Sequence, residues 1–498
     1  MAHAPRARRI RRVVFFSAGS VLACAAVAVL LAVVFSEDLV RHGFMRMLCS
    51  SDPAKQQRAV AWLVSHAAEP EVRAHAERVL PDVDDACFER MIAALQVAGV
   101  WGPSFGDGWI RYLLTQARHA EAIERSRVAA ELARRFWRES SAPPSSVGQA
   151  ATKLLEDVDA AVRLNALSLV ACLDDPKRRD LLARATADAE PAVARRAWIL
   201  VGLLAGPGQS PPSRPASADE MTRPAIEFAL SRFGTVPPRP APTGPPADAS
   251  AVVKELARLE ALPTASVDAA TLSSETPDLI RLHAVRVSKS ALPGDLLPVF
   301  RSAGASLRDL ACHVARERFT DQECRDLAEA LISSFHDEHR MGGAILAGMT
   351  PADEKLIRWL KVRVEQENLP WKVVQHYHLA LAMQGMARDG FDPEKLLLTR
   401  NISRATVVMA MLHVGRREGL DWLLDPLGSP PMRLDLLLDA LRFWSILRRY
   451  VPKVPTFHPW AGETVQRFEV EVIREWYLLH RRRLQFDAEK RIFGAPNP

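Results

Sequence analysis

Two cysteines and two histidines in the C-terminal half have the residue types of a metal site. Cys312 and Cys324 flank one predicted turn, and His336 and His339 are three residues apart, which places both imidazoles on one helical face. Thiolate sulfur and imidazole nitrogen are preferred zinc ligands. The segment HDEH nevertheless differs from the HExxH pattern, and surface histidines beside buried cysteines explain the same residues. A metal site therefore stays an alternative, and no cofactor is predicted.

No other residues form a recognisable catalytic pattern. The sequence has no Walker A motif, no GxGxxG after a strand, no GxSxG and no CxxC. His376 and His378 would point about 200° apart on a helix, so one is expected to be buried and the other exposed. We expect a protein that is not an enzyme, and the sequence identifies no small-molecule substrate. An enzyme or metal-binding domain after residue 250 is the alternative.

The six cysteines do not form a disulfide framework, because they are widely scattered. Cys24 lies in an apolar N-terminal segment. Cys87 and Cys172 fall in apolar helical patterns, which predicts buried thiols. Cys312 and Cys324 could bridge in an oxidising compartment, and the sequence does not decide their redox state.

Two loops rich in aromatic residues are candidate surfaces for binding a protein partner. They are WGPSFGDGW, residues 101–109, and YVPKVPTFHPW, residues 450–460. Exposed aromatic side chains commonly anchor partners. The alternative is that the rings pack back onto adjacent helices. The candidate residues are Trp101, Phe105, Trp109, Phe457 and Trp460.

The N-terminus predicts a membrane anchor. Residues 13–35 contain no charged side chain, and as a helix they would span about 34 Å, enough for a bilayer core. A cleaved signal peptide is the main alternative, because Ala23-Cys24-Ala25 resembles a cleavage site, and a lipoprotein signal ending at Cys24 is another. The apolar run is longer than the core of a signal peptide, which favours an uncleaved anchor in contact with membrane lipid.

Charge around this segment predicts its orientation. Residues 1–12 contain five arginines and no acid, whereas Ser36-Glu37-Asp38 follows the apolar run. The positive-inside rule places the basic tail in the cytoplasm and the C-terminal part outside it. The same tail accounts for most of the net charge of +6, which leaves the rest of the chain nearly neutral. Nucleic acid is therefore not an expected partner.

A sequence repeat with a period of about thirty residues occurs in the N-terminal half. The segments DVDAAVRLNALSLV, residues 157–170, and DAEPAVARRAWILV, residues 188–201, align with an acidic start and apolar residues at helical spacing. An earlier copy begins at Glu69-Pro70, and a fainter one at Asp52-Pro53. An acid near a helix N-terminus, proline in its first turn and alanine at a fixed offset suit closely packed helical hairpins.

These segments resemble HEAT repeats, in particular the short bacterial HEAT-like kind, over about residues 50–205. Fainter echoes occur at residues 277–284, 306–311 and 338–344. The resemblance implies an all-α fold, an α-solenoid whose concave face binds partners. HEAT-like repeats also occur in chromophore lyases and DNA glycosylases, but no catalytic residues of either family can be placed here.

The remaining sequence divides into a proline-rich segment and a second helical region. Residues 206–250 predict a linker or a loop that contains one short helix near residues 224–233. Residues 251–493 predict divergent helical repeats, with capping signals at Thr320, Thr350 and Asp392 and a C-terminal capping helix. A basic membrane-touching helix is the alternative for that last element.

The sequence as a whole favours a single-pass membrane protein whose helical repeats serve as a scaffold for protein–protein interaction or assembly. The identity of the partner, the surface that it contacts, the oligomeric state and the continuity of the two helical regions are not specified by the sequence.

Overall fold

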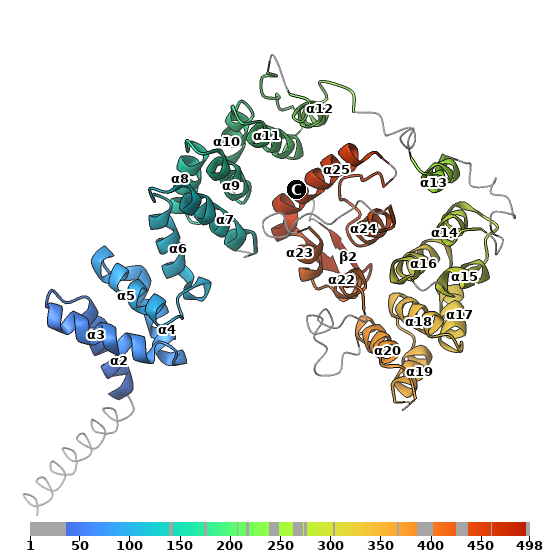
Figure 1. Ribbon diagram of the computed structural model, residues 1–498, viewed down its shortest axis with the longest axis horizontal. Helices are drawn as coiled ribbons and strands as arrows, with labels where there is room; N and C mark the ends of the chain where they lie inside the picture. Colours follow the sequence, from blue (N-terminus) through green and yellow to red (C-terminus); the bar gives the residue numbers. More distant parts are fainter. Residues whose placement is uncertain are drawn as a thin grey trace, which may run out of the picture. The chain divides into compact units, whose positions relative to one another are not determined.

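The computed structural model describes residues 36–138, 143–173, 177–206, 208–215, 219–238, 249–261, 272, 276–301, 304–365, 368–385, 402–424, 437–459 and 461–494. The chain divides into two units, residues 1–128 and 129–498, and the division falls within helix α7 (Ala122–Arg138). Regular structure in the described residues is helical apart from one short hairpin (Figure 1). The expectation of a mainly helical chain is confirmed.

None of the helices in these ranges combines the length and the apolar character needed to cross a bilayer. The basic tail, residues 1–12, and the predicted anchor, residues 13–35, lie outside the described residues.

The first unit consists of short helices stacked so that helices two apart in sequence touch, as α3 touches α5 and α4 touches α6. Their shared core includes Leu63, Val72 and Ala76, all fully buried. The helices are α2 (Ser36–Leu48), α3 (Pro53–His66), α4 (Pro70–Val79), α5 (Asp85–Val97) and α6 (Gly106–Gln116), with 3-10 turns η1 (Leu80–Asp82) and η2 (Pro103–Phe105).

A disulfide joins Cys49, directly after α2, to Cys87 on α5, with a Cα–Cα distance of 4.7 Å. The prediction of a free buried thiol at Cys87 was therefore wrong. Both sulfurs belong to the apolar core of this unit, so the apolar pattern around Cys87 was read correctly. Its partner was missed because 38 residues separate the two cysteines in sequence. Cys172, Cys312 and Cys324 are free and buried.

The second unit begins with an array of helices, and its described residues remain helical as far as η5. Its first helices are α8 (Ser145–Leu155), α9 (Ala160–Ala171), α10 (Arg178–Ala185), α11 (Pro191–Leu203) and α12 (Arg223–Arg232). Then follow α13 (Ala251–Ala261), α14 (Asp278–Val287), η4 (Pro293–Leu296), α15 (Leu297–Arg301), α16 (Ala305–Arg318), α17 (Asp321–Ile332), α18 (Asp337–Met349), α19 (Glu354–Val364), α20 (Trp371–Met383), α22 (Arg404–His413), α23 (Glu418–Leu424), α24 (Leu437–Tyr450), α25 (Glu463–His480) and η5 (Arg481–Arg483).

The repeated sequence positions have the same structural role in each copy of the repeat. The repeat valine and the repeat alanine are fully buried in α4, α9 and α11. Proline occupies the first turn of α3, α4 and α11, where the missing N–H costs no helical hydrogen bond. The later echoes bury their alanines as well, at Ala284, Ala311 and Ala344. The short helix expected within the proline-rich segment is α12, which packs on α11.

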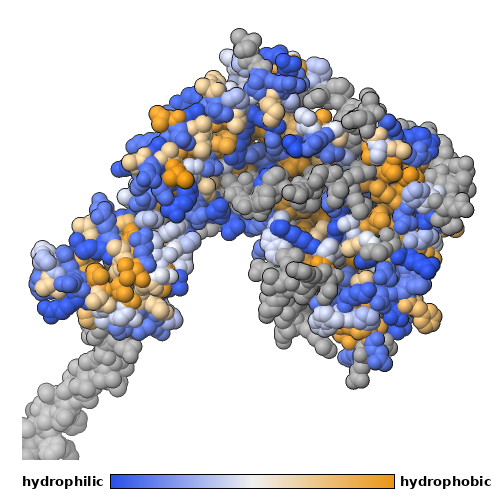
Figure 2. All heavy atoms as spheres, in the orientation of Figure 1, coloured by the Kyte–Doolittle hydropathy of each residue, from blue (hydrophilic) through white to orange (hydrophobic). Residues whose placement is uncertain are grey.

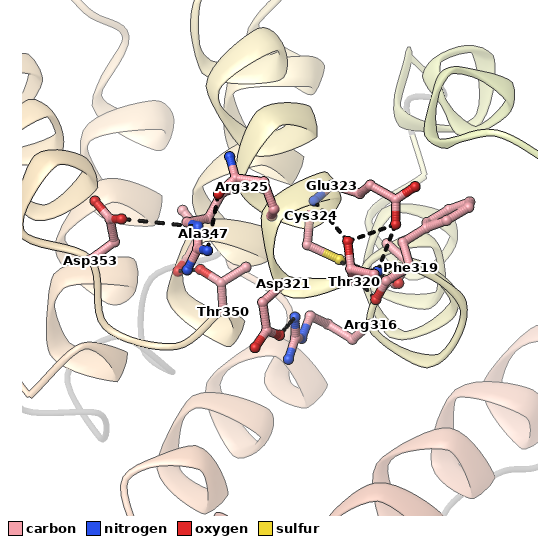
Figure 3. A network of polar contacts seen from close by, with 12 residues as sticks. Arg316, Phe319, Thr320, Asp321, Glu323, Cys324, Arg325, Ala347, Thr350 and Asp353 are labelled. Atoms are coloured by element: carbon pink, nitrogen blue, oxygen red, sulfur yellow. Dashed lines mark hydrogen bonds and ion pairs between the residues drawn. The ribbon is translucent and has the colours of Figure 1, made fainter.

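Helix capping in the second unit agrees with the sequence-based prediction at α17 and differs from it at α19 (Figure 3). Thr320 and Glu323 form the predicted capping box of α17, and Arg316 pairs with Asp321 at 2.7 Å. The expected cap at Thr350 is wrong, because the Asp353 side chain caps α19 by accepting from the N–H of Leu356. Thr350 instead ends α18, with its hydroxyl donating to the carbonyl of Ala347. The signal at Asp392 lies outside the described residues.

The C-terminal helix α25 buries one side and exposes polar residues such as Glu463, Thr464 and Arg467 on the other. It packs against α9, α11 and α23, and residues 475–478 of its last turns are buried. A two-stranded antiparallel hairpin follows, with β1 (Gln485–Asp487) and β2 (Ile492–Gly494). Strands this short leave no alternating pattern to find in the sequence. The turn is closed by Asp487, whose side chain accepts from the N–H groups of Glu489 and Lys490.

Candidate functional site

The four metal candidates do not share one site. Cys312 and Cys324 are buried on α16 and α17, and their thiols donate to the carbonyls of Gly342 and Ala315, each at 3.4 Å. Burial raises the pKa of both thiols, which keeps them protonated and poor ligands. In the part of the chain that the structure describes, no group of three or more His, Cys, Asp or Glu side chains is placed to hold a metal ion.

The histidine pair lies at the start of α18, with ring centroids 5.4 Å apart. His339 uses both ring nitrogens for hydrogen bonds. Its Nε2 donates to the carbonyl of Leu297 at 3.2 Å, so its Nδ1 accepts from the hydroxyl of Ser334 at 2.9 Å. Burial lowers the pKa of His339. This imidazole is therefore committed to fixing the α18 N-terminus against α15.

The first aromatic loop folds its rings together. Phe105 is fully buried, and Trp101 lies 4.9 Å from it and 5.5 Å from Trp109, measured between ring centroids. Tyr112 on α6 completes the cluster. These rings pack onto α5 and α6. This is the arrangement given as the alternative in the sequence analysis, in which the rings pack back onto adjacent helices.

The second loop behaves in the same way where it is described. Phe457 is buried against Phe443 and Trp444 of α24, with centroid distances of 5.6 and 6.2 Å. Trp460 lies outside the described residues. Phe457 is consequently a core residue and offers no surface to a partner.

Buried charges connect helices that are distant in sequence. Arg442 on α24 forms an ion pair with Asp309 on α16, and both side chains are less than a tenth exposed. Thr406 on α22 donates to the same carboxylate oxygen at 2.7 Å, and Arg442 also donates to Ser306 at 2.9 Å. The cluster holds α16, α22 and α24 together. Its charges neutralise each other, so we assign it to stability.

A second set of ion pairs fastens α25 to the array. Arg196 on α11 binds Glu475 through two hydrogen bonds of 2.7 and 3.1 Å, and Arg195 pairs with Glu471 at 2.7 Å. Arg481 binds Asp421 and also donates to the carbonyls of Trp137 and Arg138 at the end of α7. Arg481, the first residue of η5, is buried and fully engaged, so its guanidinium is not available to a membrane surface.

Between adjacent repeats the structure uses an ion pair that sequence reasoning missed. Arg163 on α9 donates through Nε and Nη2 to both oxygens of Asp188, at 2.7 and 2.8 Å. Asp188 begins the next copy of the repeat, and the hydrogen bond from Arg163 helps lower its carboxyl pKa against the effect of burial. The acid at the start of the copy was interpreted from the sequence only as a favourable charge for the helix dipole.

The first unit has an open groove at its surface. It lies between α5 and α6, has a volume of about 530 Å³, and is lined by Phe88, Gln96, Arg111, Tyr112 and Thr115 among others. Arg111 stacks over Phe88 at 4.3 Å and donates to Asp85 at 2.7 Å. The face of this unit drawn in Figure 2 shows apolar residues at the surface among hydrophilic ones. Such a mixed lining suits a peptide or a protein side chain.

Comparisons with known proteins add little to this geometry. No protein-family model matches the chain, and its sequence matches none of the curated proteins. Among solved structures, one match is human deoxyhypusine hydroxylase in complex with glycerol, at 19% identity over 65% of this chain and 99% of that chain, with a TM-score of 0.19. A superposition this loose carries no argument, so the fold rests on the helices described above.

Proposed function

We propose that this protein is a membrane-anchored scaffold of the HEAT-like kind, which holds a protein partner at a membrane surface. The observation that carries the proposal is the repetition of one packing scheme. The helices α4, α9 and α11 bury the same valine and alanine positions, and Arg163 of one copy binds Asp188 of the next. Helical arrays of this type place their core between neighbouring units and leave long faces open to partners.

The proposed location is a membrane, with residues 13–35 as anchor and the helical units outside the cytoplasm. The charge asymmetry around the anchor supports this orientation. The Cys49–Cys87 disulfide supports it independently, because structural disulfides persist in oxidising compartments and are rare in the cytosol.

Thiol labelling of the full chain in native membranes tests the location. Cys49 and Cys87 should resist an alkylating reagent until a reductant is added, and protease added outside right-side-out cells or spheroplasts should degrade the helical units. Alkylation of both thiols without reductant, together with protection from protease, would reject the proposed orientation.

Site-specific photocrosslinking tests the scaffold. A photoreactive side chain at Gln96, in the α5–α6 groove, should give one discrete crosslinked product in native membranes. Gln57, an exposed glutamine on α3 outside the groove lining, is the matched control. Absence of a product at Gln96, or an identical pattern from both positions, counts against this surface as the binding site.

A further inference from the structure

The hairpin that follows α25 places an arginine at the C-terminal ends of neighbouring helices, and its strand β2 touches α24 (Figure 1). Arg491, in the hairpin turn, contacts Nε2 of His413 at the end of α22 and donates to the carbonyl of Met383 at the end of α20, at 3.4 Å. Among the described residues with a positive φ, Arg491 is the one that is not glycine, at 53°. Glycine fits this backbone region best, so the guanidinium is held here against a backbone preference.

A chain of hydrogen-bond donors leads from this guanidinium to Tyr450 at the end of α24. A guanidinium only donates hydrogen bonds, so Nε2 of His413 accepts from Arg491. Burial lowers the pKa of His413, which keeps the imidazole neutral. The other ring nitrogen therefore carries the hydrogen and donates to the hydroxyl oxygen of Tyr450, with 3.3 Å between Nδ1 and Oη.

The Tyr450 hydroxyl is a buried donor that lacks an acceptor. The guanidinium of Arg449 lies 5.7 Å from the ring centroid of Tyr450 and is a second donor to its oxygen. Tyr450 is fully buried, and burial raises its pKa, so the hydroxyl keeps its proton. No group in the described part of the chain accepts that proton. Such a hydroxyl is costly to bury unless a further acceptor completes it.

A third arginine lies close by on α16. The side chain of Arg316 is 13% exposed, and its Nη1 binds Asp321 at 2.7 Å (Figure 3). Its Nε is buried and has no hydrogen-bond partner among the described residues. Burial lowers the pKa of Arg491, and the positive charges of Arg449 and Arg316 lower it further. The three guanidiniums are therefore within electrostatic range of one another.

The electrostatic field at this place is positive. The charges that act on the buried imidazole and on the phenol are in both cases those of the three arginines. Only the arginine on α16 forms an ion pair with a carboxylate in the part of the chain that the structure describes. Neighbouring acids bind other bases, since Glu317 lies 3.4 Å from Arg448 and Asp487 lies 3.4 Å from Lys490. The carbonyl ends of α20, α22 and α24 offset part of the positive charge, at about half a charge per helix.

We propose that Arg316, Arg449, Tyr450 and Arg491 form a donor centre that binds a phosphate group. The unsatisfied groups of this centre are donors, so the ligand must supply acceptors. The donors come from α16, α24 and the hairpin, and a phosphate offers three or more acceptor oxygens in different directions, whereas a carboxylate offers two in one plane. Arginine is a preferred partner of phosphate for the same reason. The donor centre is independent of the scaffold function proposed above.

Titration calorimetry and thermal denaturation of the full chain, in a detergent without phosphate, test the proposal. With the ionic strength held constant by sodium chloride, inorganic phosphate should bind at one ion per chain. The melting temperature should rise with the phosphate concentration, because a ligand that binds only the folded state stabilises it. Equal melting temperatures in phosphate and in chloride would overturn the proposal.

Three substitutions locate the bound phosphate. R491G removes the guanidinium and supplies the residue that suits the positive φ, so the hairpin should remain folded while the dissociation constant rises by about 10- to 100-fold. Y450F removes a neutral donor and should raise the constant by about 2- to 10-fold. R448Q is the matched control, because Arg448 is 55% exposed and binds Glu317. An unchanged constant in R491G, or an equal change in R448Q, would overturn the proposal.

Competition experiments distinguish the sources of the phosphate group. Displacement of inorganic phosphate by glycerol 3-phosphate assigns the donor centre to a soluble phosphate ester, and displacement only by vesicles containing phosphatidic acid assigns it to a lipid headgroup. Binding of inorganic phosphate that neither competitor displaces assigns it to the free ion. Displacement by acetate at the same concentration as phosphate would overturn the preference for phosphate.

Discussion

At the residue scale, His458 is held by a carboxylate of the following helix. Its Nδ1 lies 2.5 Å from Glu469 Oε1, and this hydrogen bond raises the pKa of His458. A raised pKa in the folded state contributes stability that is present below the unfolded pKa and is lost as the pH rises through the folded pKa. We expect H458Q to lower the melting temperature at about pH 6 and to have little effect at about pH 8. An equal effect at both values would show that the ion pair does not stabilise the fold.

The buried pair of Asp309 and Arg442 predicts strong coupling between two substitutions. Removal of either partner leaves a charge in the core without compensation, so D309L and R442M should each destabilise the protein by about 3 to 5 kcal/mol. The double variant should lose much less than the sum, because both charges have gone. Chemical denaturation of the four proteins measures the coupling. Additive losses would mean that the pair is not a unit.

At the element scale, the glycines of α18 set how closely its neighbours approach. A Cβ at Gly343 would lie 2.7 Å from Leu331 Cβ and 2.9 Å from the backbone nitrogen of Ile332, and backbone cannot move aside cheaply. G343A should therefore destabilise the protein by about 1 to 3 kcal/mol, although alanine is the better helix former.

Gly148 on α8 is the matched control, since a Cβ there meets nothing within 4 Å. G148A should stabilise the protein by about 0.5 to 1 kcal/mol. The opposite signs of two identical substitutions, measured by thermal denaturation, separate packing from helix propensity. Stabilisation by G343A would show that α17 and α18 are not in such close contact.

The disulfide of the first unit predicts a local response to reduction. A bridge that closes 38 residues is worth about 4 kcal/mol in the loop-entropy treatment. C49S/C87S should lose protease resistance and amide protection in residues 36–116, whereas the Cys172, Cys312 and Cys324 thiols of the second unit are already free. Hydrogen exchange followed by mass spectrometry measures both regions at once. Equal loss in both units would contradict a local effect.

The sequence predicted the helical elements best where the signal is local. Repeat positions such as Val162 and Ala166 lie one turn apart, so one helix reveals that they share a buried face. The cap of α19 was misplaced by three residues because Thr350 and Asp353 both suit an N-cap, and only packing selects one. Contacts such as Arg196 with Glu475, 279 residues apart, left no signal in a single sequence. The aromatic loops left two interpretations open for a related reason, since rings that bind partners and rings that fill a core have the same composition.

At the scale of the whole molecule, buried neutral histidines make the second unit sensitive to acid. Burial lowers the pKa of His283 and of His313 to about 3, and burial lowers the pKa of His376 and His413 as well. A lowered histidine pKa means that the unfolded chain binds more protons, so stability is lost as the pH falls below about 6.5. Each of the first two residues should cost about 2 kcal/mol near pH 5.

The melting temperature should consequently decrease as the pH is lowered from about 6.5 to about 4. The contribution of His458 to stability is smaller and increases as the pH is lowered. H313Q removes one titrating group and should flatten this dependence, while a substitution of the same kind at exposed His336 should leave it unchanged. A profile that is the same for H313Q and the parent protein would show that His313 is not buried in its neutral form.

The return of α25 to α9 and α11 has a consequence for biogenesis. The residues that fasten the early helices of the second unit, from Glu471 to Arg482, are translated more than 250 residues after those helices. The nascent array therefore lacks these contacts until α25 and η5 have been made. Truncation near residue 460 should then yield a protein that a quality-control protease removes, even though every earlier helix is intact.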